Sequence, residues 1–156
     1  MPTLAPHTLA MHNGHMDPIR IDLTPLRKAL ALLHDALRYW NAEPADSGLK
    51  PHLRSAVIQS FEFTYELSVK ALRRVLIERA LSEAQVVDLS FNDLLRLGAD
   101  AGLLSDPLAW RRWREMRNST SHTYDETKAQ AVVSACADFA ADADALLNRM
   151  EAASVP

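Results

Sequence analysis

The residue types that could do chemistry are concentrated between Trp110 and Tyr124. These fifteen residues contain four arginines, one histidine, one tyrosine and two of the three tryptophans. An arginine can hold a phosphate with two parallel hydrogen bonds, and a histidine can take up or release a proton near neutral pH. Arg117 and His122 are therefore the candidate catalytic pair for phosphate chemistry. In such a reaction His122 would activate an RNA 2′-hydroxyl, and Arg117 would stabilise charge on the phosphate.

Helix geometry restricts how these side chains can meet. At about 100° per residue, Asn118 and His122 lie about 40° apart on an unbroken helix, whereas Arg117 and His122 lie about 140° apart. Asn118 could therefore orient His122, and Arg114 could add a second phosphate contact. Arg117 and His122 meet only if the helix ends near Ser121 or if a second copy of the chain completes the site. A structural role in an arginine-rich helix remains the alternative.

No clustered set of Asp, Glu and His ligands accompanies this motif, so the sequence favours chemistry without a metal, and we expect no cofactor. Residues 1–20 hold three prolines and three histidines without apolar periodicity. We interpret them as a disordered or vector-derived tail, because a floppy segment rarely preorganises metal ligands. Residues 21–152 are expected to form a single helical domain.

Composition restricts the class of protein. The chain has 156 residues, 48% of them apolar and only 4 of them glycine, which is typical of one folded, turn-poor domain. The net charge of −3 leaves only the local arginine cluster as a basic surface. A single cysteine excludes an internal disulfide framework and suggests a reducing compartment. There is no apolar run long enough for a membrane span and no signal-peptide pattern, so we expect a cytoplasmic protein.

Apolar spacing and capping residues predict helices throughout. Thr24 before Pro25 starts the first helix, Ser90 starts a short one, and Asp106 before Pro107 starts the helix that carries the motif. Thr123 with Glu126 forms a capping-box pattern for the last helix. The expected helices cover residues 25–41, 51–80, 91–104, a segment from 107 into the motif, and 124–152. No segment alternates as a strand, so we predict an all-α fold: an antiparallel four-helix bundle with an extra short helix before the Arg-x4-His motif.

The helix expected over residues 51–80 has one apolar and one charged face. We expect its apolar stripe to pack against the stripe of the last helix, the two sets being Ile58, Phe61, Tyr65 and Leu72, and Val132, Phe139 and Leu146. The charged face carries Glu62 and Glu66, like charges on adjacent turns that repel mildly. Either they form a solvated charge ladder or one of them faces the arginine cluster. We include Glu66 as a supporting site residue on the second interpretation.

Two separated motifs resemble a known family. They are the stretch from Ile58 to Leu67 with Lys70, and the stretch from Arg117 to Glu126 that follows Trp110. In this order they resemble the nucleotidyltransferase substrate-binding proteins, which belong to the HEPN superfamily of small helical bundles. The likeness covers about residues 24–150. Val69 departs from the tryptophan often found there, which affects packing more than chemistry.

The resemblance implies a ribonuclease motif of the form Arg-x4-6-His, here Arg117 and His122, usually assembled across a homodimer. It also implies a separately encoded minimal nucleotidyltransferase as partner, the two forming a toxin–antitoxin pair. In some pairs the partner adenylylates a tyrosine at the position of Tyr124. The alternative for Tyr124 is that its ring packs at the start of the last helix.

Two function classes therefore remain open. The first is a metal-independent endoribonuclease that acts as a toxin. The second is a non-catalytic subunit that binds a nucleotide or substrate for the nucleotidyltransferase. Cleavage of RNA by the purified protein in the presence of EDTA would distinguish them.

Overall fold

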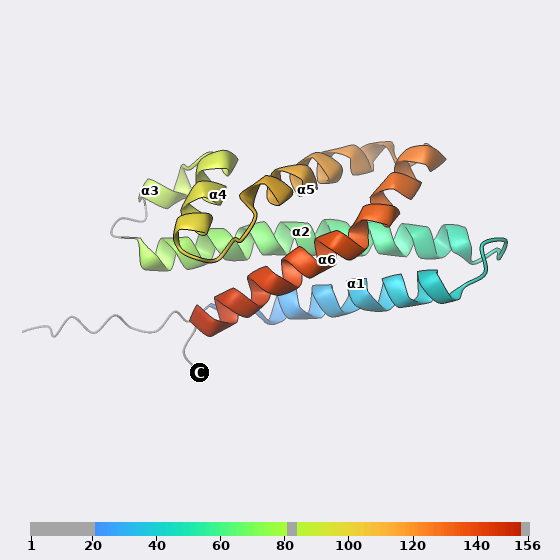
Figure 1. Ribbon diagram of the computed structural model, residues 1–156, viewed down its shortest axis with the longest axis horizontal. Coiled ribbons are helices and arrows are strands. Elements are labelled where there is room, and N and C mark those ends of the chain that lie inside the picture. Colours follow the sequence, from blue (N-terminus) through green and yellow to red (C-terminus); the bar gives the residue numbers. More distant parts are fainter. Residues whose placement is uncertain (1–20, 81–83, 154–156) are drawn as a thin grey trace, which may run out of the picture.

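The computed structural model describes residues 21–80 and 84–153, and within those ranges every regular element is a helix (Figure 1). The four long helices are α1 (Thr24–Ala42), α2 (Lys50–Arg79), α5 (Pro107–Ser119) and α6 (Glu126–Ala153). The short ones are α3 (Ala84–Val87), α4 (Phe91–Asp100) and the 3-10 helix η1 (Thr120–His122). The predicted all-α bundle with an extra short helix before the motif is confirmed. The tail expected over residues 1–20 lies outside the described residues.

Helix α2 is the centre of the arrangement. Helices α1 and α2 lie side by side and run in opposite directions, α6 crosses over both, and α5 lies along the other side of α2 (Figure 1). Helices α3 and α4 also pack on α2, near its C-terminal end. Because α5 runs along α2, the C-terminal end of α5, which carries the motif, lies against the middle of α2.

The core forms where the two predicted stripes meet. All seven of their members are buried, and Phe61 and Phe139 meet edge to face with ring centroids 4.7 Å apart. Trp113 and Trp110 also contact Phe139 edge to face, at 5.6 Å and 6.0 Å. The tryptophan contacts attach α5 to α6, and the Phe61–Phe139 contact attaches α2 to α6. Cys136, one turn before Phe139, is fully buried, and burial raises the pKa of its thiol to about 12.

Two predicted helix starts are confirmed by capping contacts. The side chain of Ser90 accepts the N–H of Asp93 at the start of α4 (3.2 Å). The carboxylate of Asp106 accepts the N–H of Ala109 at the start of α5 (3.1 Å). The start of the helix that carries the motif could therefore be predicted from its capping residue.

The two other starts were predicted wrongly by one or two residues. Thr24 lies inside α1, and its N–H donates to the carboxylate of Asp22 (3.0 Å), so Thr24 is not the cap. Helix α6 is preceded by Asp125, whose carboxylate accepts the N–H of Thr127 (2.9 Å), and not by a cap at Thr123. In both places an aspartate accepts the N–H two residues ahead, a local turn that competes with the longer capping pattern.

Helix α4 is shorter than predicted. It ends at Asp100 instead of residue 104, because Gly102 takes a left-handed conformation with φ of 77°. The N–H of Leu103 then turns back to the carbonyl of Gly98 (2.9 Å), as at many helix C-termini. None of the described helices has the length and hydropathy needed to cross a bilayer.

Candidate functional site

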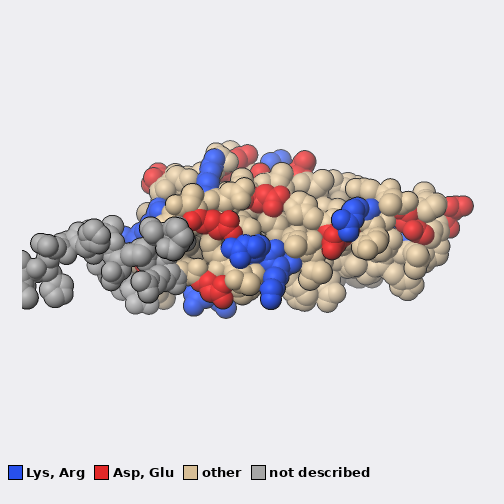
Figure 2. Space-filling model, turned by 90° about the horizontal axis from the view of Figure 1, so that it is seen from below, with Lys and Arg blue, Asp and Glu red and all other residues tan. Residues whose placement is uncertain are grey.

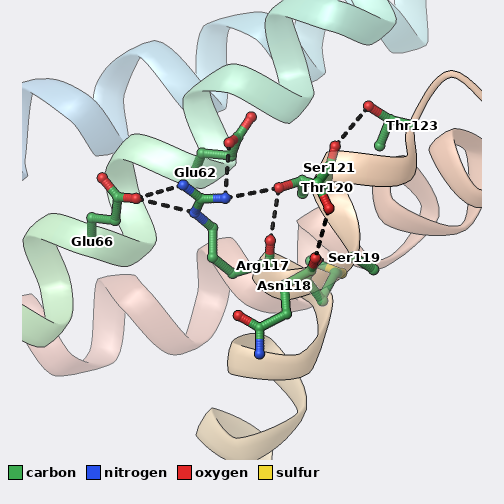
Figure 3. Close-up of polar contacts among 9 residues, drawn as sticks. Glu62, Glu66, Arg117, Asn118, Ser119, Thr120, Ser121 and Thr123 are labelled. Atoms are coloured by element: carbon green, nitrogen blue, oxygen red, sulfur yellow. Dashed lines mark hydrogen bonds and ion pairs between the residues drawn. The ribbon is translucent and has the colours of Figure 1, made fainter.

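The motif lies where α5 changes into η1, and hydroxyl side chains cause that change. Each of four hydroxyls donates to the carbonyl three residues earlier, and contacts of this kind are drawn in Figure 3. The donors are Ser119 (2.7 Å), Thr120 (2.7 Å), Ser121 (3.2 Å) and Thr123 (2.9 Å). Side chains thereby satisfy carbonyls that a continuing α-helix would have used. The α-helix ends at Ser119, close to the end expected near Ser121.

Arg117 is held between two glutamates of α2 (Figure 3). Its Nε and Nη2 atoms donate to Oε1 of Glu66 at 3.1 Å and 2.6 Å. Its Nη1 lies 3.0 Å from Oε2 of Glu62. The second interpretation of the charged face of α2 is therefore correct, and both carboxylates, not one, meet the arginine.

Thr120 completes this arrangement. Its Oγ1 accepts a hydrogen bond from Nη1 of Arg117 (2.9 Å) and donates one to the Arg117 carbonyl (2.7 Å). Thr120 is only 7% exposed, so it is a fixed support. We call Glu62, Glu66 and Thr120 the Arg117 clasp. Because the side chain of Arg117 is 30% exposed, each ion pair is worth at most about 1 kcal/mol.

His122 has different surroundings from Arg117. It is exposed, and its ring contacts the ring of Tyr124, with centroids 6.2 Å apart and an interplanar angle of 74°. In the described part of the chain, no hydrogen bond or ion pair joins His122 to Arg117. The helix end therefore does not bring the two candidate catalytic residues into contact within one chain. Completion of the site by a second copy stays a prediction.

The other predicted site residues are also placed. Asn118 is exposed, and its side chain projects away from the Arg117 clasp (Figure 3), with no contact to His122. Its proposed role in orienting His122 therefore stays a prediction. Arg114 is exposed and lies over the ring of Phe91, with its Cζ 4.6 Å from the centroid. Tyr124 is 85% exposed, which rules out a buried packing role for its ring in this chain.

Glu62 and Tyr65 also belong to this region but are not among the predicted site residues. The sequence marks Glu62 only as a like charge beside Glu66, and it places Tyr65 in the core. The signal for Glu62 was present, since a glutamate pair on consecutive turns is relieved by a cation between its members. Burial raises the pKa of the Tyr65 hydroxyl, while the positive charges of Arg114 and Arg117 act in the opposite direction. The hydroxyl of Tyr65 is therefore within electrostatic range of both arginines.

Charges elsewhere on the molecule are mixed. Figure 2 shows acidic and basic side chains next to one another on the side where α1 lies in Figure 1. Arg27 pairs with Glu151 at 2.6 Å, and Asp35 pairs with Arg38 at 2.7 Å. The described residues of this face therefore form no broad basic patch for a nucleic acid. Within the described ranges, no group of three or more His, Cys, Asp and Glu residues is arranged to hold a metal ion.

Known proteins share both the sequence and the fold. A Haemophilus influenzae protein named probable ribonuclease HepT is 41% identical over 98 residues, which are 63% of this chain and 67% of that protein. A solved Haemophilus influenzae structure, described as revealing the fold of a substrate binding domain of a nucleotidyltransferase, matches with a TM-score of 0.75 and 33% identity. It covers 83% of this chain and 99% of its own.

A solved structure from Thermus thermophilus matches with a TM-score of 0.65 and 31% identity, over 80% of this chain and 97% of its own. The family model described as nucleotidyltransferase substrate binding protein like matches residues 21–152, which include all the candidate site residues. The chain therefore belongs to the nucleotidyltransferase substrate binding protein like family.

Proposed function

We propose that the protein is a metal-independent endoribonuclease of the HEPN type, the toxin of a cytoplasmic toxin–antitoxin pair that a minimal nucleotidyltransferase neutralises. The observation that supports this proposal most is the arrangement of side chains at the end of α5. There an oriented, part-exposed arginine and an exposed histidine lie within six residues of chain. The relative named probable ribonuclease HepT supports it.

The proposed reaction needs only these side chains and the RNA itself. His122 takes the proton of a ribose 2′-hydroxyl, whose oxygen attacks the adjacent phosphorus. Arg117 stabilises the negative charge on the pentacoordinate phosphate, and Arg114 holds a neighbouring phosphate. The bond to the 5′-oxygen breaks and that oxygen takes up a proton. The products are a 2′,3′-cyclic phosphate end and a 5′-hydroxyl end.

The separation of Arg117 from His122 supports a homodimer in which a second copy completes the site. A groove of about 450 Å³ between α1 and α2 offers a surface for that copy. Leu32 and Phe63, which line it, are 63% and 53% exposed, and adjacent exposed apolar side chains mark contact surfaces. Glu66 lines the groove and also binds Arg117, so a second copy seated there would lie beside the arginine.

The dimer can be tested at this groove. Light scattering at micromolar concentration should give twice the chain mass for the parent and a reduced mass for Phe63→Glu, because a buried unpaired carboxylate disfavours association. Leu108→Glu, at an apolar position of α5 that is 65% exposed and outside the groove, is the matched control. A parent that is strictly monomeric would exclude the dimer.

The second candidate function is a non-catalytic subunit that binds a nucleotide or substrate for the nucleotidyltransferase. The lack of contact between Arg117 and His122 favours it, since binding needs only the arginine. The solved relative described as a substrate binding domain fits this function as well.

The deciding experiment is RNA cleavage by the purified protein, free of partner, in EDTA. We expect cleavage by the parent and a loss of about a hundredfold or more in His122→Ala, the usual contribution of an acid–base group. His52→Ala, at another exposed histidine, is the control for nonspecific damage. Arg117→Lys should also lose activity because a point charge cannot reproduce the guanidinium fork, whereas Arg74→Lys should not. Parent-like cleavage by both motif variants would assign the activity to a contaminant.

A further inference from the structure

We propose that Glu62 and Glu66 are specificity-determining residues of the site: they occupy Arg117 in the free protein, and a ligand phosphate must displace Glu66 to reach it. This inference rests on the proposed role of Arg117 as the phosphate-binding residue. A ligand phosphate then competes with a carboxylate of the same chain for Arg117.

The hydrogen bonds of Arg117 show why displacement is needed. The Nε hydrogen and one Nη2 hydrogen point to Glu66. The Nη1 atom serves both Thr120 and Glu62. Among the residues that the structure describes, only one Nη2 hydrogen of Arg117 is left without a partner. A phosphate binds through two parallel N–H groups on one edge of the guanidinium. On each of the two suitable edges at least one of these groups already has a partner, so the phosphate must displace that partner.

Glu66 is the partner that can leave. Its side chain is 56% exposed, against 29% for Glu62, so water can replace the arginine at its carboxylate. It also covers the Nε–Nη2 edge, which is one of the two edges suited to a phosphate. Glu62 and the buried Thr120 hold Nη1, and they keep Arg117 oriented while Glu66 moves aside.

The charge of the clasp determines which ligands can displace Glu66. The clasp places two carboxylates against the single guanidinium of Arg117, so at this arginine a free anion meets more negative than positive charge. A lone phosphate at Arg117 brings no second phosphate group to offset that repulsion. An RNA strand does, because a neighbouring phosphate can bind Arg114 one turn earlier on α5. The clasp therefore selects an oligoribonucleotide over inorganic phosphate or a mononucleotide.

The first test is affinity for a 2′-O-methyl oligoribonucleotide, which lacks the reacting hydroxyl, measured by fluorescence anisotropy. Glu66→Gln should tighten the Kd by about two- to fivefold at low ionic strength, the range that an exposed ion pair allows. The gain should shrink as salt rises. Glu78→Gln, an exposed carboxylate of the same helix, is the matched control and should leave the Kd unchanged. Variants are compared at the same oligomeric state.

The second test measures the clasp without RNA. Phenylglyoxal modifies accessible arginines, and peptide mass spectrometry gives the rate at each one. Glu66→Gln should speed modification of Arg117 but leave the rate at Arg112 unchanged. An unchanged rate at Arg117 would overturn the clasp.

The two tests together separate the possible failures. If Glu66→Gln frees Arg117 and tightens RNA binding, the inference is supported. If it frees Arg117 but RNA affinity stays at the parent value, the competition is refuted while RNA binding stands. If no variant binds RNA although Arg117 reacts faster, the clasp is supported and the proposed ribonuclease function fails.

Discussion

The ring of Tyr124 meets the ring of His122 edge to face, with 6.2 Å between their centroids. Tyr124 is 85% exposed, so its hydroxyl is open to another protein. The exposed tyrosine and the candidate acid–base residue are therefore direct neighbours. Any group attached to the tyrosine would lie next to the histidine and, in the proposed ribonuclease, near the position of the RNA phosphate.

We predict that the partner nucleotidyltransferase adenylylates Tyr124 and that the modification inhibits RNA cleavage. The attached AMP would add bulk beside His122, and its phosphate would compete for the Arg117 fork. Incubation with the partner and ATP should increase the mass by one or more AMP groups, and Tyr124→Phe should abolish the increase. Tyr39→Phe removes another exposed tyrosine and should leave it intact. No mass change with a demonstrably active partner would leave complex formation alone as the means of control.

Phe139 lies at the centre of the aromatic contacts of the core. It is fully buried and contacts Phe61, Trp110 and Trp113. Phe139→Ala should lower the free energy of unfolding by about 3–5 kcal/mol, because the cavity lies where three helices meet. Chemical denaturation measures the loss, and Leu108→Ala at an exposed position should change stability by about 0.5 kcal/mol or less. A loss of similar size in both variants would contradict this account of the core.

The helices and their packing faces could be predicted because they depend on local signals. Apolar spacing identified the two stripes that meet at Phe61 and Phe139. Capping chemistry identified Ser90 and Asp106 as helix starts. At the two misplaced starts, Thr24 and the beginning of α6, an aspartate near the threonine accepts the N–H two residues ahead and sets the local turn. Sequence spacing alone does not decide between this turn and a threonine cap.

The contact between Arg117 and the charged face of α2 was one of two interpretations left open by the sequence, which could not decide between them. Glu66 is 51 residues away in the chain, so its contact depends on how α5 packs along α2. Helical periodicity gives the direction of a side chain on its own helix but not the rotation of one helix against another. The surroundings of His122 depend on the four hydroxyl bonds that turn the chain at η1. Composition showed only that this segment is a poor helix interior.

Trp113 joins α5 to α6 by a hydrogen bond as well as by its ring. Its indole Nε1–H donates to the carboxylate of Asp142 at 2.8 Å. Trp113→Phe keeps an aromatic ring but removes the donor, so we expect a loss of about 1–3 kcal/mol in the free energy of unfolding. Asp142→Asn keeps an acceptor oxygen and should lose less. A double-mutant cycle of Trp113→Phe with Asp142→Ala, which removes the acceptor, should show coupling; its absence would show that this bond contributes nothing to stability.

The last prediction concerns how Arg117 and His122 come to act together. No contact joins them within the described part of one chain, so we expect each site to take its arginine from one copy and its histidine from the other. Arg117→Ala and His122→Ala should each be inactive alone. Mixed after partial unfolding and refolding, they should regain about a quarter of parent RNA cleavage, because half of randomly formed two-fold dimers are mixed and each of those has one complete site.

A mixture of His122→Ala with the double variant lacking both side chains is the control, since no pairing of those chains gives a complete site. Activity is followed with a fluorogenic RNA in EDTA. If the mixed single variants stay as inactive as this control while light scattering shows that dimers have formed, the two residues act within one chain. The turn at η1 would then have to change on RNA binding to bring His122 to Arg117.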